Sequence, residues 1–319
     1  MHTMLNPLIN IPPDFIQKTE QDKRLAYSDT DSAYLIFDLP FNKFDNIRTL
    51  VDYIQSISKK IDAVYNEALN YYVGTFGGMN PEYNTMKFKS EVVAYQGFFN
   101  TKKFYALSKA WDEGTFFDKP KIKQTGGQIK KADVTKISEM LLKRIYETLV
   151  IPSETKDLYS LYKKVFIEIK NSIKMQLKKD IDDLNFNSFG VPKKWGFKAA
   201  RTMQWVTGAR LYNQICEDLF RPGDSMIMVP IKGNFNNLKD FINNGGNNVN
   251  EFALREEDTK DLKTLSIPPS MTNDQKQKLA AALEMYSIKV DFDEVMIFNV
   301  DKKLEVFEKL FPPELKLKG

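Results

Sequence analysis

The chain has 319 residues, of which 42% are hydrophobic and 28% charged, so it is long enough for two domains and too apolar to be disordered throughout. Its formal net charge is only +4, and its single cysteine (Cys216) and single histidine (His2) argue against a disulfide framework, a zinc site and a histidine-based triad. No stretch approaches the ~18 consecutive apolar residues of a membrane-spanning helix. We expect a cytoplasmic protein without membrane contact.

The N-terminal part is predicted to combine strands with one long helix. Residues 1–22 contain Pro7, Pro12 and Pro13 and form an irregular lead-in. Strand-forming runs and a helical spacing of apolar residues then follow. The sequence predicts strands over Lys23–Ser28 and Ser32–Leu39, an amphipathic helix over 44–72, and strands over Met86–Tyr95 and Thr101–Leu107 that are joined around Gly97.

The C-terminal part is predicted to be mostly helical. One short apolar run, Met226–Ile231, is typical of a strand, and the segment 233–250 is so rich in Asn and Gly that we expect a surface loop. Apolar spacing predicts helices over 137–149, 155–179, 208–219 and 274–286. A part with strands followed by a helical part is an α+β plan.

The segment Tyr27-Ser28-Asp29-Thr30-Asp31-Ser32 concentrates two carboxylates in a tight turn between two predicted strands. Aspartate is common in turns for structural reasons, because its side chain bonds to its own backbone. A rigid hairpin is also a suitable platform for Mg²⁺, which proteins usually hold with one or two carboxylates. The residues alone leave both interpretations open.

This segment resembles the Tyr-Gly-Asp-Thr-Asp-Ser signature of the family B DNA polymerases, their third palm motif. The resemblance implies that Asp31 is a metal-ligating carboxylate, that Asp29 is an auxiliary one, and that Glu91 is a third palm acid. It also implies a site for two Mg²⁺ ions, with Ser28, Thr30 and Ser32 setting the geometry of the turn. Ser28 stands where the family has glycine.

A second resemblance lies about seventy residues downstream, in a stretch from Lys102 to Lys131 that holds eight lysines and three acids. The segment Lys102-Lys103-Phe104-Tyr105-Ala106 is similar to the family's Lys-Lys-Arg-Tyr-Ala strand, which follows the primer-template backbone. The run 123–133 resembles the entry into the thumb, and 205–213 is similar to a later thumb stretch. The DNA contacts that these resemblances imply are Lys102, Lys103, Tyr105, Lys123, Lys130, Lys131 and Arg210.

The resemblance implies a domain plan. After the lead-in, residues 23–124 would be the C-terminal part of the polymerase palm, an incomplete antiparallel sheet with a long helix. Residues 125–319 would be a mostly helical thumb domain with the Asn-rich loop 233–250.

The family's exonuclease domain, first palm aspartate motif and fingers are missing from this sequence. We therefore expect a subunit or fragment of a DNA-directed DNA polymerase of phage type, which acts in the host cytosol on primer-template DNA and dNTPs. An N-terminal polymerase chain would complete it, and a split gene is favoured over a fragment of a longer chain. The alternative is a non-catalytic DNA-binding accessory module with a palm-thumb shape.

Two interpretations stay open for the C-terminal tail. Leu304, Phe307, Leu310 and Phe311 form an apolar cluster where phage-type polymerases carry a sliding-clamp peptide. The favoured alternative is a last helix that packs on its own domain.

Overall fold

The computed structural model describes residues 25–28, 32–37, 39, 43–78, 80–101, 104–126, 134–150, 157–216, 220–244, 252, 254–308, 311 and 315. The chain divides into two compact units. The first comprises Met1–Gly127 with Leu149–Glu154, and the second comprises Gln128–Thr148 with Thr155–Gly319. Both contain helices and antiparallel sheet, so the fold is α+β. The assignment of these units to a palm and a thumb stays a prediction.

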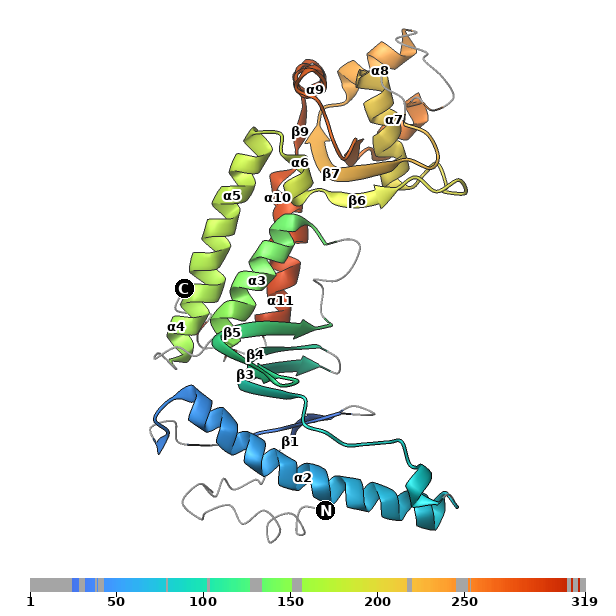
Figure 1. The fold of residues 1–319 in the computed structure, drawn as a ribbon. Coiled ribbons are helices and arrows are strands. Elements are labelled where there is room, and N and C mark those ends of the chain that lie inside the picture. Colours follow the sequence, from blue (N-terminus) through green and yellow to red (C-terminus); the bar gives the residue numbers. More distant parts are fainter. Residues whose placement is uncertain are drawn as a thin grey trace. The chain divides into compact units, whose positions relative to one another are not determined.

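The first unit contains the long amphipathic helix that the sequence predicts over 44–72. Helix α2 spans Ile47–Phe76 as one continuous element (Figure 1). Asn46 caps its N-terminus, because its Oδ1 accepts a hydrogen bond from the Thr49 amide at 3.0 Å while its own amide donates one to the Thr49 hydroxyl oxygen at 3.3 Å. Its buried side chains are Leu50, Val51, Ile57, Ile61 and Val73.

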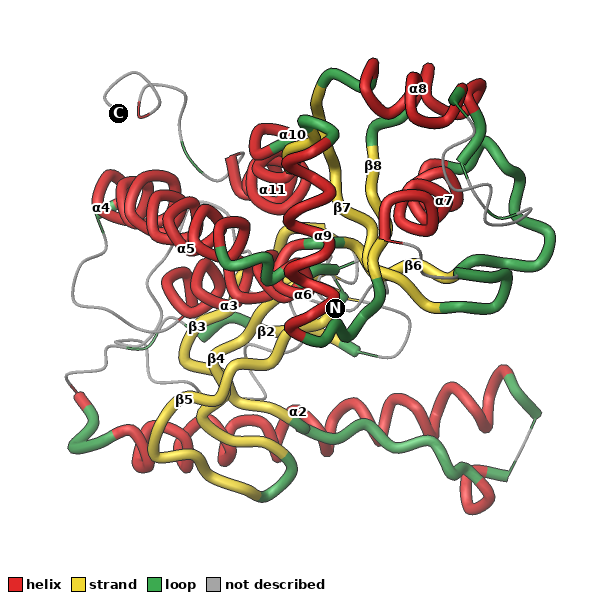
Figure 2. The backbone as a smooth tube through the Cα atoms, turned by 90° about the horizontal axis from the view of Figure 1, so that it is seen from above, coloured by secondary structure: helices red, strands yellow, loops and turns green. Residues whose placement is uncertain are grey.

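The first unit also contains a three-stranded antiparallel sheet, formed by β3 (Val92–Thr101), β4 (Phe104–Asp112) and β5 (Thr115–Thr125), with β4 in the centre (Figure 2). The predicted strand over 86–95 was wrong for 86–91, and Gly97 lies inside β3 instead of at a turn. A Cβ at Gly97 would meet Phe99 Cε2 at 2.7 Å and Leu107 Cδ2 at 2.9 Å, so this glycine makes room for neighbouring side chains. Strand β5 was not predicted. It contains Pro120, which is tolerated because β5 is an edge strand.

The helices at the start of the second unit agree with the predicted ones. Helix α3 spans Lys136–Val150. A continuous helical run then comprises α4 (Leu158–Tyr162), the π-helical segment η5 (Lys163–Ile169) and α5 (Lys170–Asp182), and the short α6 (Phe186–Phe189) follows. The C-terminal run α10 (Phe292–Met296), η7 (Ile297–Asp301) and α11 (Lys302–Glu308) also contains a π-helical segment. Lys170 Nζ and Asp301 Oδ1, 2.8 Å apart, connect the two runs.

The second unit is less helical than predicted, because it holds a sheet of its own. Strand β7 confirms the predicted run around 226–231, and it pairs antiparallel with three strands that the sequence did not reveal. Each of the three has only three or four residues, too few for a clear alternating pattern. The strands are β6 (Val191–Lys194), β7 (Ser225–Gly233), β8 (Thr264–Ile267) and β9 (Ile288–Val290).

Helix α7 (Gln204–Cys216) packs against β8 at close range. A Cβ at Gly208 would lie 2.8 Å from the Ser266 backbone nitrogen, so only glycine allows this approach. Helix α9 (Asn273–Met285) confirms the predicted helix over 274–286, and a 3₁₀ turn, η6 (Glu256–Asp261), precedes β8.

The predicted Asn-rich loop over 233–250 is wrong for its first half, which contains helix α8 (Asn236–Asn243). Leu238 of this helix is fully buried, and Phe241 packs against Tyr286 with ring centroids 5.6 Å apart. The burial of this apolar face outweighs the poor helix propensity of asparagine. Residues 245–250 lie outside the described part of the chain.

The C-terminal apolar cluster packs inside the second unit. Leu304, Phe307 and Phe311 are buried, while Leu310 lies outside the described residues. The Phe307 ring lies 5.5 Å from that of Tyr146, and the Phe311 ring lies 5.6 Å from that of Tyr162. These contacts support the alternative in which the last helix packs on its own domain. Among the described residues, no helix has both the length and the apolarity to cross a bilayer.

Candidate functional site

The predicted turn with the two aspartates lies between two paired strands, β1 (Leu25–Ser28) and β2 (Ala33–Leu35). They run antiparallel with Tyr27 opposite Tyr34 and Ser28 opposite Ala33, which confirms the predicted pairing on both sides of the turn. Ser28 is a strand residue with extended backbone, so serine needs no positive φ there. Ser32 is exposed. Asp29, Thr30 and Asp31 lie outside the described residues.

The hairpin is attached to the three-stranded sheet by aromatic side chains. The hydroxyl oxygens of Tyr34 on β2 and Tyr105 on β4 are 2.8 Å apart, and the two ring centroids are 5.2 Å apart. Phe99, which lies opposite Tyr105 on β3, places its ring centroid 5.4 Å from that of Tyr34. Tyr105 is only 8% exposed. This cluster brings together the two segments that resemble polymerase motifs.

Tyr34 is a residue of this site that the sequence did not identify. It was predicted only as part of a strand. The feature of the sequence that bears on Tyr34 is the alternation of side chains along a strand. It places Tyr34 on the opposite face of β2 from Ala33 and Leu35. Nothing in the sequence shows that this face meets Tyr105.

The predicted Lys-Lys pair follows β3 and precedes β4. Thr101 pairs with Phe104 at this end of the sheet, so the described strands stop on either side of Lys102 and Lys103, which lie outside the described residues. Lys130 and Lys131 also lie outside them. Their predicted DNA contacts therefore stay predictions.

Lys123 lies on the edge strand β5, directly opposite Leu107, and Lys121 lies opposite Lys109. Directly paired residues point to the same face of a sheet, so Lys121 and Lys123 share one face. Lys109 is buried and forms an ion pair with Asp112, whereas no ion pair between described residues includes Lys121 or Lys123. Lys121 Nζ lies 5.4 Å from the Phe117 ring centroid. This edge of the sheet therefore presents two cations without a carboxylate partner among the described residues.

Glu91 lies at the end of the β3–β4 pair that is farthest from the Lys-Lys pair. It directly precedes Val92, which pairs with Asp112. At ~3.3 Å per residue, Asp112 is about 23 Å along β4 from Tyr105. The Glu91 side chain is 57% exposed and its Oε1 lies 3.7 Å from Lys89 Nζ. A hydrogen bond to Glu113, with the charges of Glu113 and Glu91, raises the pKa of Lys89.

Among the described residues, Glu91 forms a surface ion pair with Lys89. No group of three or more potential metal ligands (His, Cys, Asp or Glu) occurs among them. Because Asp29 and Asp31 are not described, the predicted metal role of Glu91 stays a prediction.

Arg210, a predicted DNA contact, is buried in the second unit, and its contact with DNA stays a prediction. Arg210 lies on α7, is 8% exposed, and places its guanidinium carbon 5.7 Å from the Trp195 ring centroid. Its charge also acts on Asp258. The described contacts of this guanidinium are therefore with Trp195 and with the charge of Asp258.

Asp258 is held by a bidentate ion pair with Arg201, in which Nε lies 3.0 Å from Oδ1 and an outer nitrogen 2.5 Å from Oδ2. Burial alone would raise the pKa of Asp258. The hydrogen bonds from Arg201 and the Arg255 amide, together with the charges of Arg201 and Arg210, outweigh burial and hold the pKa below its usual value.

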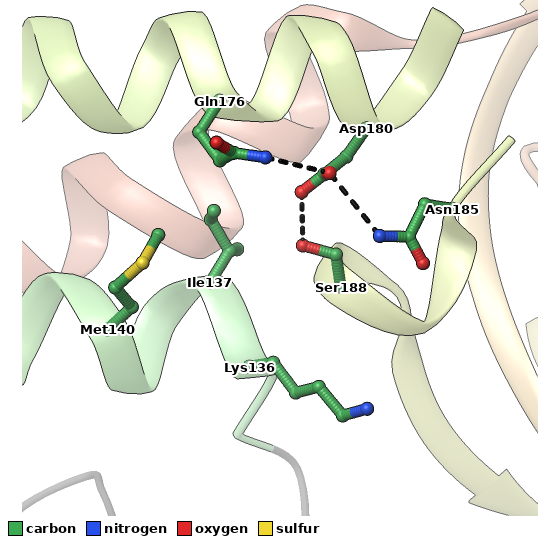
Figure 3. A pocket seen from close by; sticks show the side chains of 7 residues that line it. All are labelled: Lys136, Ile137, Met140, Gln176, Asp180, Asn185 and Ser188. Atoms are coloured by element: carbon green, nitrogen blue, oxygen red, sulfur yellow. Dashed lines mark hydrogen bonds between the residues drawn. The ribbon is translucent and has the colours of Figure 1, made fainter. Parts of the chain in front are cut away.

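A cavity of about 250 Å³ lies between α3, α5 and α6 in the second unit (Figure 3). Asp180 on its wall is 6% exposed and accepts hydrogen bonds from Gln176 Nε2 at 3.0 Å, Asn185 Nδ2 at 3.3 Å and Ser188 Oγ at 2.5 Å. Figure 3 shows these three donors converging on the carboxylate. Asp180 thus connects α5 to α6. The lining residues are Lys136, Ile137, Met140, Gln176, Asp180, Asn185 and Ser188.

The comparisons with known proteins do not identify a family. No family model matches the sequence, and no curated protein matches it at a significant level.

Proposed function

We propose that this chain is a subunit of a family B DNA-directed DNA polymerase, which transfers nucleotides from dNTPs to a primer 3′ end. Asp31, with Asp29 beside it, would hold Mg²⁺, and carboxylate oxygens are ligands that Mg²⁺ prefers. When bound, Mg²⁺ supplies stabilisation of the negative charge on the attacking and leaving oxygens. Lys102, Lys103 and Lys123 would hold the primer-template backbone. The chain's own part is to position these side chains.

One observation carries this proposal: the Tyr34–Tyr105 contact joins the β1–β2 hairpin to the strand that directly follows the Lys-Lys pair. A polymerase needs its metal-binding carboxylates close to the residues that hold the primer backbone, because the primer 3′ end must reach the metal. The two segments are 71 residues apart in sequence. Their contact supports a common site, while the sequence resemblance supplies its chemistry.

A second chain is part of the proposal. A two-metal site needs more carboxylates than this hairpin supplies, and closure on the nucleotide needs fingers. We call the chain that carries the exonuclease, first palm motif and fingers the companion chain. It would be recognised by those motifs in its own sequence.

Primer extension on a labelled template tests the function. We expect no extension by this chain alone with Mg²⁺ and dNTPs, and extension once the companion chain is added. Asp31→Asn should abolish extension and leave DNA binding unchanged or slightly tighter, since one negative charge near phosphate is removed. The matched control is Asp182→Asn, at an exposed position of α5. Extension by the Asp31→Asn complex at the wild-type rate would refute the proposal, and retained DNA binding without extension by the wild-type pair would favour the accessory-module alternative.

A further inference from the structure

The cavity between α3, α5 and α6 has no part in the proposed function. Its volume of about 250 Å³ is slightly below the ~300–1,000 Å³ of typical small-molecule pockets, so it suits a ligand of only a few heavy atoms. All of its lining residues belong to the second unit. Small-molecule pockets combine apolar side chains with a few polar groups that orient the ligand. The charged groups that line this cavity are those of Asp180 and Lys136.

Asp180 brings a buried negative charge to the cavity. Its carboxylate accepts hydrogen bonds from three neutral side chains, but no described residue forms an ion pair with it. Buried carboxylates in proteins are usually paired with a cation. A carboxylate has about four acceptor positions, and the three hydrogen bonds leave one of them on Oδ2. A cationic donor in the cavity would therefore both occupy that position and balance the charge.

Lys136 brings a positive charge to the same cavity. It is the first residue of α3, it is exposed, and no ion pair between described residues includes it. A cation is unfavourable at the N-terminus of a helix, where the helix dipole is positive. Figure 3 shows Lys136 and Asp180 on different sides of the cavity. An anionic group in the cavity would therefore be stabilised beside Lys136.

The apolar part of the cavity wall comes from α3. Ile137 and Met140 of this helix line the cavity, and Figure 3 shows them on the same side of it. The cavity thus presents a carboxylate, an ammonium group and an apolar wall. A small molecule that matches all three carries an ammonium group, a carboxylate and a short apolar side chain.

Two other kinds of ligand match the cavity less well. A phosphate group would meet Lys136 but would be repelled by the buried charge of Asp180. A metal ion would meet the N–H and O–H donors that surround Asp180, which point their positive ends toward the carboxylate. Among the described residues, no group of three or more acidic, histidine or cysteine side chains is available to hold such an ion.

We propose that this cavity binds a free α-amino acid with an apolar side chain, whose ammonium group bonds to Asp180 and whose carboxylate pairs with Lys136. The inference does not depend on the proposed function. It adds a small-molecule site to the second unit.

The test measures the binding of L-leucine to the full chain by isothermal titration calorimetry. One molecule should bind per chain and raise the Tm, because a ligand that binds only the folded state stabilises it. Two analogues separate the contacts: 4-methylpentanoate lacks the ammonium group, and 3-methylbutylamine lacks the carboxylate. Each should bind at least about tenfold more weakly than L-leucine, since each loses a charge-assisted hydrogen bond.

Two variants assign the contacts to residues. Lys136→Met should weaken L-leucine binding by at least about tenfold and leave 3-methylbutylamine binding unchanged. Asp180→Asn should weaken L-leucine binding and leave 4-methylpentanoate binding unchanged. Because Asp180→Asn also disturbs hydrogen bonds within the fold, Lys136→Met is the decisive variant. The matched control is Lys143→Met, at an exposed position of α3 outside the cavity lining, and it should change none of these affinities.

Four results would overturn the proposal. The first is that neither L-leucine nor any other apolar amino acid binds the wild-type chain. The second is an analogue that binds as tightly as L-leucine, and the third is undiminished L-leucine binding by Lys136→Met. The fourth is a fall in the Tm of ligand-free Lys136→Met, because Lys136 would then pair with Asp180 within the chain.

Discussion

The hydroxyl groups of Tyr34 and Tyr105 lie 2.8 Å apart, and this contact attaches the β1–β2 hairpin to the central strand of the three-stranded sheet. The two-stranded hairpin is too small to be stable by itself. Its position relative to β4 therefore depends on side-chain contacts such as this one. The contact joins the two strands that flank the predicted carboxylates to the strand that follows the predicted Lys-Lys pair.

Tyr34→Phe should lower the free energy of unfolding by about 0.5–1.5 kcal/mol, because the partly buried hydrogen bond between the two hydroxyl groups is lost. Tyr105→Phe should cost a similar amount. In a double-mutant cycle the cost of both changes together should be smaller than the sum of the two single costs. Urea denaturation measures all three. Tyr83→Phe, at a 72% exposed tyrosine, is the control, and additive costs for the pair would contradict the coupling.

Replacing a lysine that contacts duplex DNA should reduce the salt dependence of binding. Each phosphate contact contributes ~0.9 to the slope of log K against log salt. Lys102→Ala, Lys103→Ala, Lys123→Ala and Lys131→Ala should each lower that slope by about 0.9, equally for unrelated sequences. Fluorescence anisotropy at several salt concentrations gives the slope, with Lys239→Ala on α8 as the control. Unchanged slopes for all four variants would mean that these lysines are only a solvated basic surface.

The Arg201–Asp258 pair should make stability depend on acid pH. The folded-state pKa of Asp258 lies below its ordinary value of 3.8. Ionised Asp258 therefore stabilises the fold fully above the unfolded pKa, and this contribution is lost as the pH falls through the lower folded pKa. The difference in unfolding free energy between wild type and Asp258→Asn should be largest near neutral pH and shrink below about pH 4. A difference that stays constant with pH would refute the assignment; Asp182→Asn controls for general charge effects.

Gly208→Ala should destabilise the second unit. The new Cβ would lie 2.8 Å from the Ser266 nitrogen and 3.1 Å from the Leu265 carbonyl carbon, and backbone atoms of β8 cannot move aside cheaply. Overpacking of this kind costs ~1–3 kcal/mol. Gly196→Ala is the matched control, because the nearest atom to its Cβ would be 4.0 Å away. Thermal unfolding compares the two; equal Tm values would show that α7 can shift away from β8.

Long elements could be predicted from the sequence because their signal is local. Helix α2 repeats its apolar spacing over 30 residues and begins at a capping box. Helices α3 and α9 repeat an apolar spacing over 15 and 13 residues. The pairing of β1 with β2 was predictable because the aspartates between them are typical turn residues. In each case the residues that determine the structure are neighbours in the sequence.

Other features were decided by contacts between distant residues. Gly97 signals a turn by composition, but it lies inside a strand, where the side chains of Phe99 and Leu107 fill the space beside it. Arg210 has the charge of a DNA contact, but its place over Trp195 buries it. The segment that forms α8 is polar enough for a loop, but Leu238 finds a buried position. Tyr34 and Tyr105 are ordinary strand residues until packing brings their hydroxyls together. Burial and close approach depend on the whole three-dimensional arrangement, since the free energy of each side chain is set by neighbours that only the folded chain supplies.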